Sequence, residues 1–162
     1  MLGSAARSLL TAAPLEGWAE QDPEDWWAAV VDCLREVLGK GVEAGEISAI
    51  GLTGQMHGAV AMDRDNEVLR PCILWCDQRT APQCEEIMGK FGRRRFLELT
   101  CNIALPGFTA PKILWIRENE PEIYGRIAKV LLPKDYIRFR LTGVFATEVS
   151  DASGTVLFDV RN

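Results

Sequence analysis

Gly51-Leu52-Thr53-Gly54-Gln55-Met56-His57-Gly58 is the stretch around which the rest of the chain is organised. It follows an apolar, partly β-branched run, Ile47 to Leu52, and precedes a second apolar run, Ala59 to Met62. We expect the first run to be a strand, followed at the sheet edge by a polar loop that the Gln-Met-His tripeptide forms. In open α/β sheets, ligands bind at such strand ends. The alternative interpretation is a hairpin turn with a solvated histidine.

The composition is that of one globular domain. The chain has 162 residues, of which 48% are hydrophobic and 25% charged, enough to bury a core. A net charge of −5 argues against a nucleic-acid-binding surface, and the basic run Arg93-Arg94-Arg95 better fits a solvated helix face. The sequence contains no membrane-length apolar stretch and no signal-peptide core. We therefore expect a soluble, cytoplasmic protein with neither nucleic-acid nor membrane partners.

The cysteines fit a reducing compartment, where thiols serve as small apolar residues. They number five, an odd count without a CxxC pair: Cys33, Cys72, Cys76, Cys84 and Cys101. A metal site could in principle combine Cys72, Cys76 and Cys84 with His57, the single histidine, but these spacings match no zinc pattern. We expect no metal on this chain.

A helix is predicted to start at Asp22-Pro23-Glu24-Asp25, because Asp suits the N-cap, Pro the first helical position and acids the first turn. Two adjacent apolar stripes follow: Trp26, Val30, Leu34 and Val37, and Trp27, Val31, Leu34 and Leu38. Such a broad apolar side predicts packing on a sheet. Gly39 and Gly41 are expected to end the helix.

The remaining chain alternates between strand and helix patterns. Short buried strands are predicted at Cys72 to Trp75 and Val130 to Leu132. Helices are predicted from Ala81 to Leu99 with breaks near Gly89 and Gly92, from Thr109 to Asn119, and from Pro121 and Pro133. Phe145 to Glu148 and Thr155 to Phe158 are expected to flank a polar turn. The alternation predicts an α/β fold with a mixed sheet and flanking helices.

Several polar residues follow predicted strand ends or open helices, where side chains can converge on a ligand. They are Gln55, His57, Asp77, Arg79, Lys112 and Asp151. Trp75 beside Asp77 is typical of a polyol site, in which an aromatic face meets carbon atoms and a carboxylate accepts hydroxyl hydrogens. Taken singly, each residue is better explained by a structural role: core packing for Trp75, a local ion pair for Asp77 and Arg79, and a turn for Asp151. The sequence contains neither a Walker A loop nor a dinucleotide fingerprint.

Five segments in order resemble the N-terminal domain of the FGGY carbohydrate kinases. They are Gly17 to Trp27, Gly54 to Gly58, Ile73 to Thr80, Leu105 to Lys112 and Leu131 to Tyr136. The Gln-Met-His form, together with Asp151-Ala152-Ser153-Gly154-Thr155, is similar to the xylulokinase branch, whereas glycerol kinases carry Arg-Glu in place of Met56-His57. The resemblance extends from about Ser8 to Asn162.

The resemblance implies a ribonuclease-H-like fold of the actin/hexokinase ATPase type. It also implies ATP-dependent phosphorylation of a ketopentose, D-xylulose to D-xylulose 5-phosphate. The implied substrate-binding residues are Gln55, Met56, His57, Trp75, Asp77 and Arg79. Met56 would pack against sugar carbons and His57 would hydrogen-bond a hydroxyl group. Asp77 and Arg79 are expected to hold the site together, with direct substrate contact less firmly implied.

The chain also departs from the family. The family's Asp-x-Gly-Thr hairpin, which holds phosphate and magnesium, has no counterpart before Trp18. The family's catalytic aspartate lies in a Gly-Gly-Asp motif, which we expect beyond Asn162. We expect the adenine-binding domain beyond Asn162 as well. We therefore expect residues 1–162 to be a truncated N-terminal, sugar-binding domain without a catalytic residue, inactive alone. The complete enzyme would use ATP and Mg²⁺, with neither held by this chain.

Two other functions remain open. The parent protein could phosphorylate another ketose or a polyol, or the chain could be a non-catalytic sugar-binding or interaction module. In either case, absence of the hairpin would leave a sheet edge unpaired, which predicts a homo-oligomer.

Overall fold

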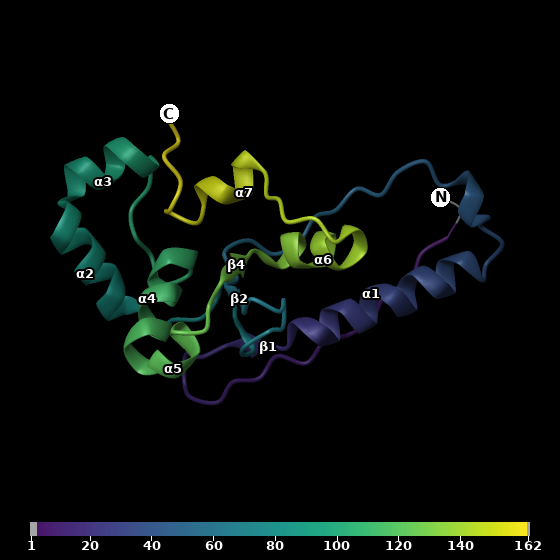
Figure 1. Ribbon diagram of the computed structural model, residues 1–162, viewed down its shortest axis with the longest axis horizontal. Coiled ribbons are helices and arrows are strands. Elements are labelled where there is room, and N and C mark those ends of the chain that lie inside the picture. The colour runs from purple at the N-terminus through teal and green to yellow at the C-terminus, as the bar shows by residue number, and fades with distance from the viewer. Residues whose placement is uncertain (1–2, 162) are drawn as a thin grey trace.

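The computed structural model describes residues 3–161. Its longest axis runs from α2 (Ala81–Phe91) and α3 (Arg93–Thr100) at one end to the C-terminal end of α1 (Pro23–Leu38) at the other (Figure 1). The other helical elements are η1 (Ala44–Glu46), α4 (Thr109–Asn119), α5 (Pro121–Tyr124), α6 (Pro133–Thr142) and α7 (Val149–Ser153). None of the helices between residues 3 and 161 is long and apolar enough to cross a membrane.

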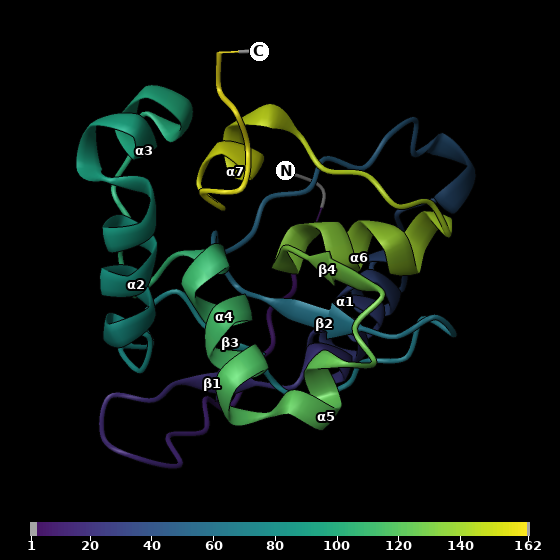
Figure 2. The same cartoon turned by 60° about the vertical axis from the view of Figure 1, so that its left-hand side comes forward.

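The strands form two antiparallel pairs. β1 (Glu20–Gln21) pairs with β3 (Cys72–Ile73), and β2 (Val60–Met62) pairs with β4 (Lys129–Leu131). Figure 2 shows β2 and β4 side by side next to α6. An isolated bridge between Ala59 and Ile73 connects the two pairs, which otherwise form separate two-stranded sheets. All pairings within residues 3–161 are antiparallel, which corrects the predicted mixed sheet.

The predicted strand from Ile47 to Leu52 is wrong. This segment is extended but pairs with no strand in the described part of the chain. Ile47, Ile50 and Leu52 are 45%, 57% and 38% exposed. A strand is stable only when a neighbour satisfies its backbone N–H and C=O groups, which apolar, β-branched composition alone cannot supply.

Helix α1 begins and ends as predicted. Asp22 Oδ1 accepts a hydrogen bond from the backbone N–H of Glu24 at 2.9 Å, and the helix ends at Leu38 before Gly39. The prediction that one whole side packs on a sheet holds only at the first turns, because Trp26 is 6% exposed whereas Leu34 and Leu38 are 37% and 36% exposed. The C-terminal half therefore extends beyond the strands.

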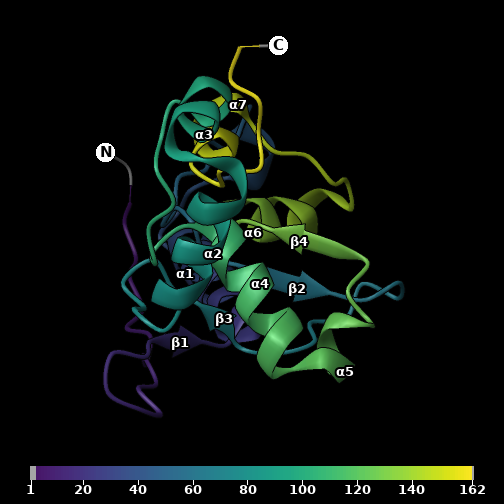
Figure 3. The ribbon, with the colours of Figure 1, turned by 90° about the vertical axis from the view of Figure 1, so that its left-hand side faces the viewer.

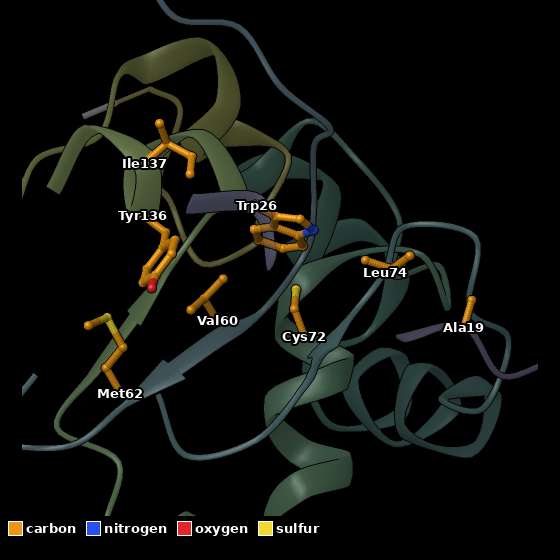
Figure 4. Close-up of a cluster of buried hydrophobic side chains, with 8 residues drawn as sticks. All are labelled: Ala19, Trp26, Val60, Met62, Cys72, Leu74, Tyr136 and Ile137. Carbon is orange, nitrogen blue, oxygen red and sulfur yellow. The ribbon is translucent and has the colours of Figure 1, made fainter. Parts of the chain in front are cut away.

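The main core lies where α1 and α6 meet the strands. Trp26 of α1 contacts Tyr136 of α6 edge to face, with ring centroids 6.5 Å apart. Figure 4 shows Tyr136 beside Val60 of β2, and Trp26 next to both Val60 and Cys72 of β3. The cluster comprises Ala19, Trp26, Val60, Met62, Cys72, Leu74, Tyr136 and Ile137. A second cluster joins α2, α3 and α4, so the helical end of the molecule has a core of its own.

The helices between residues 81 and 142 match their predictions, with one difference. The chain breaks at Gly92, whose φ of 72° lies in the left-handed region, whereas Gly89 lies inside α2. The polar turn predicted at residues 151–154 lies largely within a short helix instead, α7, which the Glu148 side chain caps. The chain then runs beside α3, where the Val160 N–H donates to the Leu99 carbonyl at 3.0 Å (Figure 3).

Candidate sugar-binding site

Hydrogen bonds from α4 hold the backbone of His57 in an unusual conformation. Its φ of 67° is left-handed, a region in which histidine is enriched among non-glycine residues. The His57 carbonyl oxygen accepts hydrogen bonds from Thr109 Oγ1 at 3.1 Å and from Lys112 Nζ at 2.8 Å. Both donors are buried. The first turn of α4 therefore fixes the end of the loop that carries Gln55 and Met56.

The imidazole ring of His57 is held by two further segments. Nδ1 lies 3.0 Å from the carbonyl oxygen of Gly154, and the Phe108 ring lies against the imidazole with centroids 4.6 Å apart. Burial lowers the pKa of His57 below its ordinary value of 6.5, with a further decrease from Lys112, while the Gly154 carbonyl and Asp151 oppose the shift. The ring is therefore neutral at pH 7, so it offers one donor and one acceptor nitrogen.

The neighbouring side chains on the loop remain accessible. Met56 is 42% exposed. Gln55 is half-buried, and its Nε2 donates to Gln21 Oε1 at a long 3.4 Å. Trp75 is 57% exposed, and its backbone carbonyl lies so close to Gly107 that a Cβ there would be 2.5 Å from the oxygen. The loop before α4 is thus packed on the Trp75 backbone, leaving the indole free.

Asp77 and Arg79 are enclosed. Asp77 is fully buried, and its carboxylate accepts hydrogen bonds from the backbone N–H of Ala19 at 2.7 Å and from Arg79 at 2.7 Å. The Arg79 guanidinium also pairs with Glu20 at 2.7 Å and lies 3.5 Å from the Trp18 ring centroid. Because these partners occupy both charged groups, the pair ties segment 18–20 to the turn after β3.

Lys112 lies between this buried pair and the His57 loop. Its Nζ donates to the carbonyl oxygens of His57 and Gly107, at 2.8 and 2.7 Å. Burial lowers the pKa of Lys112 to about 8, and Asp77 partly offsets this while Arg79 adds to it. Lys112 therefore braces the loop through backbone contacts and does not present a charge to solvent.

Sequence reasoning missed Phe108, Thr109, Lys134 and Gly154 as partners of the site. Asp151, a polar candidate in the sequence, is buried and pairs with Lys134 at 2.9 Å, which joins α7 to α6. These contacts connect residues far apart in the chain, and spacing alone gives no sign of them. The segments around 105–112 and 151–155 did stand out as motifs, which was the available signal.

The chemistry of these side chains suits a polyol. A thioether and an exposed indole can cover carbon atoms, and a neutral imidazole and an amide can hydrogen-bond hydroxyl groups. Within residues 3–161, no three His, Cys, Asp or Glu side chains come together as a metal site. Cys72 and Cys84 are buried thiols whose pKa values burial raises to about 12 and about 11.

Comparison with known proteins identifies the family. Residues 1–162 match the model of the N-terminal domain of the FGGY family of carbohydrate kinases. The chain belongs to the FGGY family. It is 45% identical over 160 residues to the xylulose kinase of Escherichia coli (strain K12), covering 99% of this chain and 32% of that protein. It is 50% identical over 145 residues to the xylulose kinase of Bacillus subtilis (strain 168), covering 89% of this chain and 29% of that protein.

A solved structure gives the same result for the fold. The crystal structure of xylulose kinase from Rhodospirillum rubrum superposes with a TM-score of 0.90 at 30% identity, covering 95% of this chain and 32% of that chain. The predicted actin/hexokinase-type fold is confirmed by this match. This FGGY chain spans about a third of the length of these relatives.

Proposed function

We propose that residues 1–162 form part of the N-terminal, sugar-binding domain of an ATP-dependent kinase that converts D-xylulose to D-xylulose 5-phosphate. The observation that carries this proposal is the pairing of a neutral, firmly held His57 with Met56 on one accessible loop. The 45% and 50% identity to xylulose kinases supports the choice of sugar.

In this proposal, the side chains divide into contacts and supports. Met56 and Trp75 cover sugar carbons, while His57 and Gln55 hydrogen-bond hydroxyl groups. A neutral donor and acceptor pair suits a hydroxyl because a hydroxyl can both donate and accept. Asp77 and Arg79, assigned to substrate binding from the sequence, act by positioning the turn that carries Trp75, since their charged groups are buried and paired.

ATP and Mg²⁺ belong to the complete kinase. Phosphoryl transfer requires a metal, phosphate-binding groups and a positioned base together. Mg²⁺ on a nucleotide is usually held by one or two carboxylates together with the phosphates, and none of the residues that we place in the sugar site has this role. We therefore assign no catalytic residue to residues 3–161 and expect the isolated chain to be inactive. A cytoplasmic location and a homo-oligomeric state complete the proposal.

Two other functions compete with this one. A kinase for another ketose or for a polyol would use the same loop with a different sugar. A non-catalytic sugar-binding module would bind without turnover. The experiment is a coupled ATP-consumption assay on the complete protein that carries this segment, with D-xylulose, D-ribulose, L-ribulose and glycerol as acceptors.

We expect D-xylulose to give the highest kcat/KM, at least about tenfold above the others, because one correctly paired hydroxyl is worth about 1.4 kcal/mol or more. A higher kcat/KM for another acceptor would show that this acceptor, and not D-xylulose, is the substrate. Sugar binding without turnover in the complete protein would support the non-catalytic module instead.

A further inference from the structure

The backbone conformation of Gly154 does not require glycine. Its φ of −72° and ψ of −9° are helical values that any L-residue adopts. A Cβ at this position, however, would lie 2.6 Å from His57 Cε1, 3.0 Å from His57 Nδ1 and 3.2 Å from Met56 Cε. Because Gly154 has no side chain, the His57 and Met56 side chains can occupy this space.

The carbonyl of the same glycine determines which imidazole nitrogen carries the proton. It lies 3.0 Å from His57 Nδ1, within hydrogen-bond distance. A carbonyl oxygen can only accept, so Nδ1 must be the donor. In a neutral ring, Nε2 then has a free lone pair and is an acceptor. This tautomer follows from the contact geometry.

Gly154 itself is anchored from three sides. The Glu148 side chain caps α7 by accepting from the N–H groups of Ser150 and Asp151, both at 2.7 Å. Asp151 pairs with Lys134 of α6 at 2.9 Å. The Thr155 carbonyl accepts from the Ala110 N–H of α4 at 3.1 Å. The segment that carries Gly154 is thus tied to both helices beside the site.

We propose that Gly154 is a positioning residue for the ligand site: its carbonyl selects the Nδ1–H tautomer of His57, and its lack of a side chain admits His57 and Met56. Nε2 of His57 then accepts a hydrogen bond from a ligand hydroxyl that donates. The site favours a neutral polyol at this point over a group that only accepts, such as a carboxylate. The ligand part of this inference rests on the proposed sugar-kinase function, whereas the tautomer does not.

The tautomer can be measured directly, because His57 is the single histidine of the chain. We would label histidine with ¹⁵N and record two-bond ¹H–¹⁵N correlations at pH 7.5. The expected pattern is a protonated Nδ1 and an unprotonated Nε2. A protonated Nε2 in the wild-type chain would overturn the proposal without any variant.

Gly154→Ala tests the positioning role, with Gly89→Ala as its matched control. Gly89 lies within α2, and a Cβ there meets nothing within 4 Å. We expect Gly154→Ala to shift the imidazole signals and to populate the other tautomer, and Gly89→Ala to leave the spectrum unchanged. An unchanged spectrum in Gly154→Ala would contradict the role.

Kinetics of the complete kinase provide the second readout. We expect Gly154→Ala to raise KM for D-xylulose about ten- to a hundredfold with a smaller change in kcat, the effect of one disrupted hydrogen bond. Gly89→Ala should keep both constants. Normal wild-type activity with an unchanged KM in Gly154→Ala would overturn the positioning role. Failure of the wild-type enzyme to phosphorylate D-xylulose would instead overturn the proposed function, and the spectra would still decide the tautomer.

Discussion

The carbonyl oxygen of Gly154 lies 3.0 Å from Nδ1 of His57, joining residues 97 positions apart in the chain. Thr109 and Lys112 hold the carbonyl of the same histidine from α4. Backbone and ring are therefore fixed by different segments, which sustains a left-handed conformation that would otherwise be costly. The candidate site forms where these segments meet the 54–58 loop.

We expect the pKa of His57 to lie below 6.5, because burial disfavours the imidazolium form more than the Gly154 carbonyl favours it. As the pH falls below about 6.5, the unfolded chain takes up the proton first. The stability contribution of neutral His57 is thus present above that pH and lost below it. An NMR titration of the imidazole protons measures the pKa.

The unfolding free energy gives an independent check on the same group. The stability advantage of wild type over His57→Gln should be constant above pH 7.5 and should decrease as the pH falls below 6.5. A measured pKa above 7, or a difference that does not change with pH, would contradict the burial argument.

Local signals in the sequence predicted much of the fold. The start of α1 follows from Asp22-Pro23, and its end from Gly39, because capping chemistry acts within one helical turn. The strand predicted from Ile47 to Leu52 failed because pairing is a long-range property. Helix α7 was missed because it is short and is capped by Glu148, a residue type outside the preferred N-caps.

Asp77→Asn should destabilise the chain by about 3–5 kcal/mol, since the buried Arg79 guanidinium then keeps only Glu20 as a charged partner. Urea unfolding at pH 7.5 measures the loss. The control is Glu98→Gln, whose partner Arg94 is 93% exposed, and we expect a change within about 0.5 kcal/mol. Equal effects of the two substitutions would show that the Asp77–Arg79 pair does not support the fold.

Lys112 should make stability rise with pH in the alkaline range. Its pKa is about 8 in the folded chain and 10.5 as the ordinary value. Between these values the unfolded chain binds more protons, so the free energy of unfolding increases with pH. The difference between wild type and Lys112→Met should rise from pH 8 to 10.5 and stay flat below pH 8. Lys90→Met, at a side chain 68% exposed, should show no such slope.

A flat difference for Lys112→Met across pH 8 to 10.5 would mean that the buried amine titrates normally. In that case, the two hydrogen bonds from Nζ to the carbonyls of His57 and Gly107 would stabilise the ammonium form enough to offset its burial.

The exposed segment around Ile50 should promote self-association. It is extended, carries three exposed apolar side chains and pairs with no described strand, so another chain can add to it. Sedimentation velocity at increasing concentration should show a dimer or larger species. Ile50→Lys should weaken association and raise its Kd at least about tenfold, whereas Val144→Lys, at another exposed site, should leave the Kd unchanged. A monomer at all concentrations would contradict this expectation.

The candidate site could be predicted only in part. Gln55, Met56 and His57 stood out because glycines follow an apolar run, and their loop is accessible in the structure. Asp77 and Arg79 also stood out, but their burial and pairing could not be inferred from a spacing of two residues. The supports at Thr109 and Gly154 depend on tertiary packing, which brings them to His57 from distant parts of the chain.

We propose that His57 contacts the sugar and takes no part in the chemistry. The most direct test of this proposal is kcat and KM for D-xylulose in the complete kinase, comparing wild type with His57→Ala and His57→Gln. We predict an increase in KM of about ten- to a hundredfold for Ala, partly restored by Gln, because one hydrogen bond of about 1–3 kcal/mol is lost. A collapse of kcat beyond about a thousandfold with KM unchanged, the scale of losing a general base, would contradict the account.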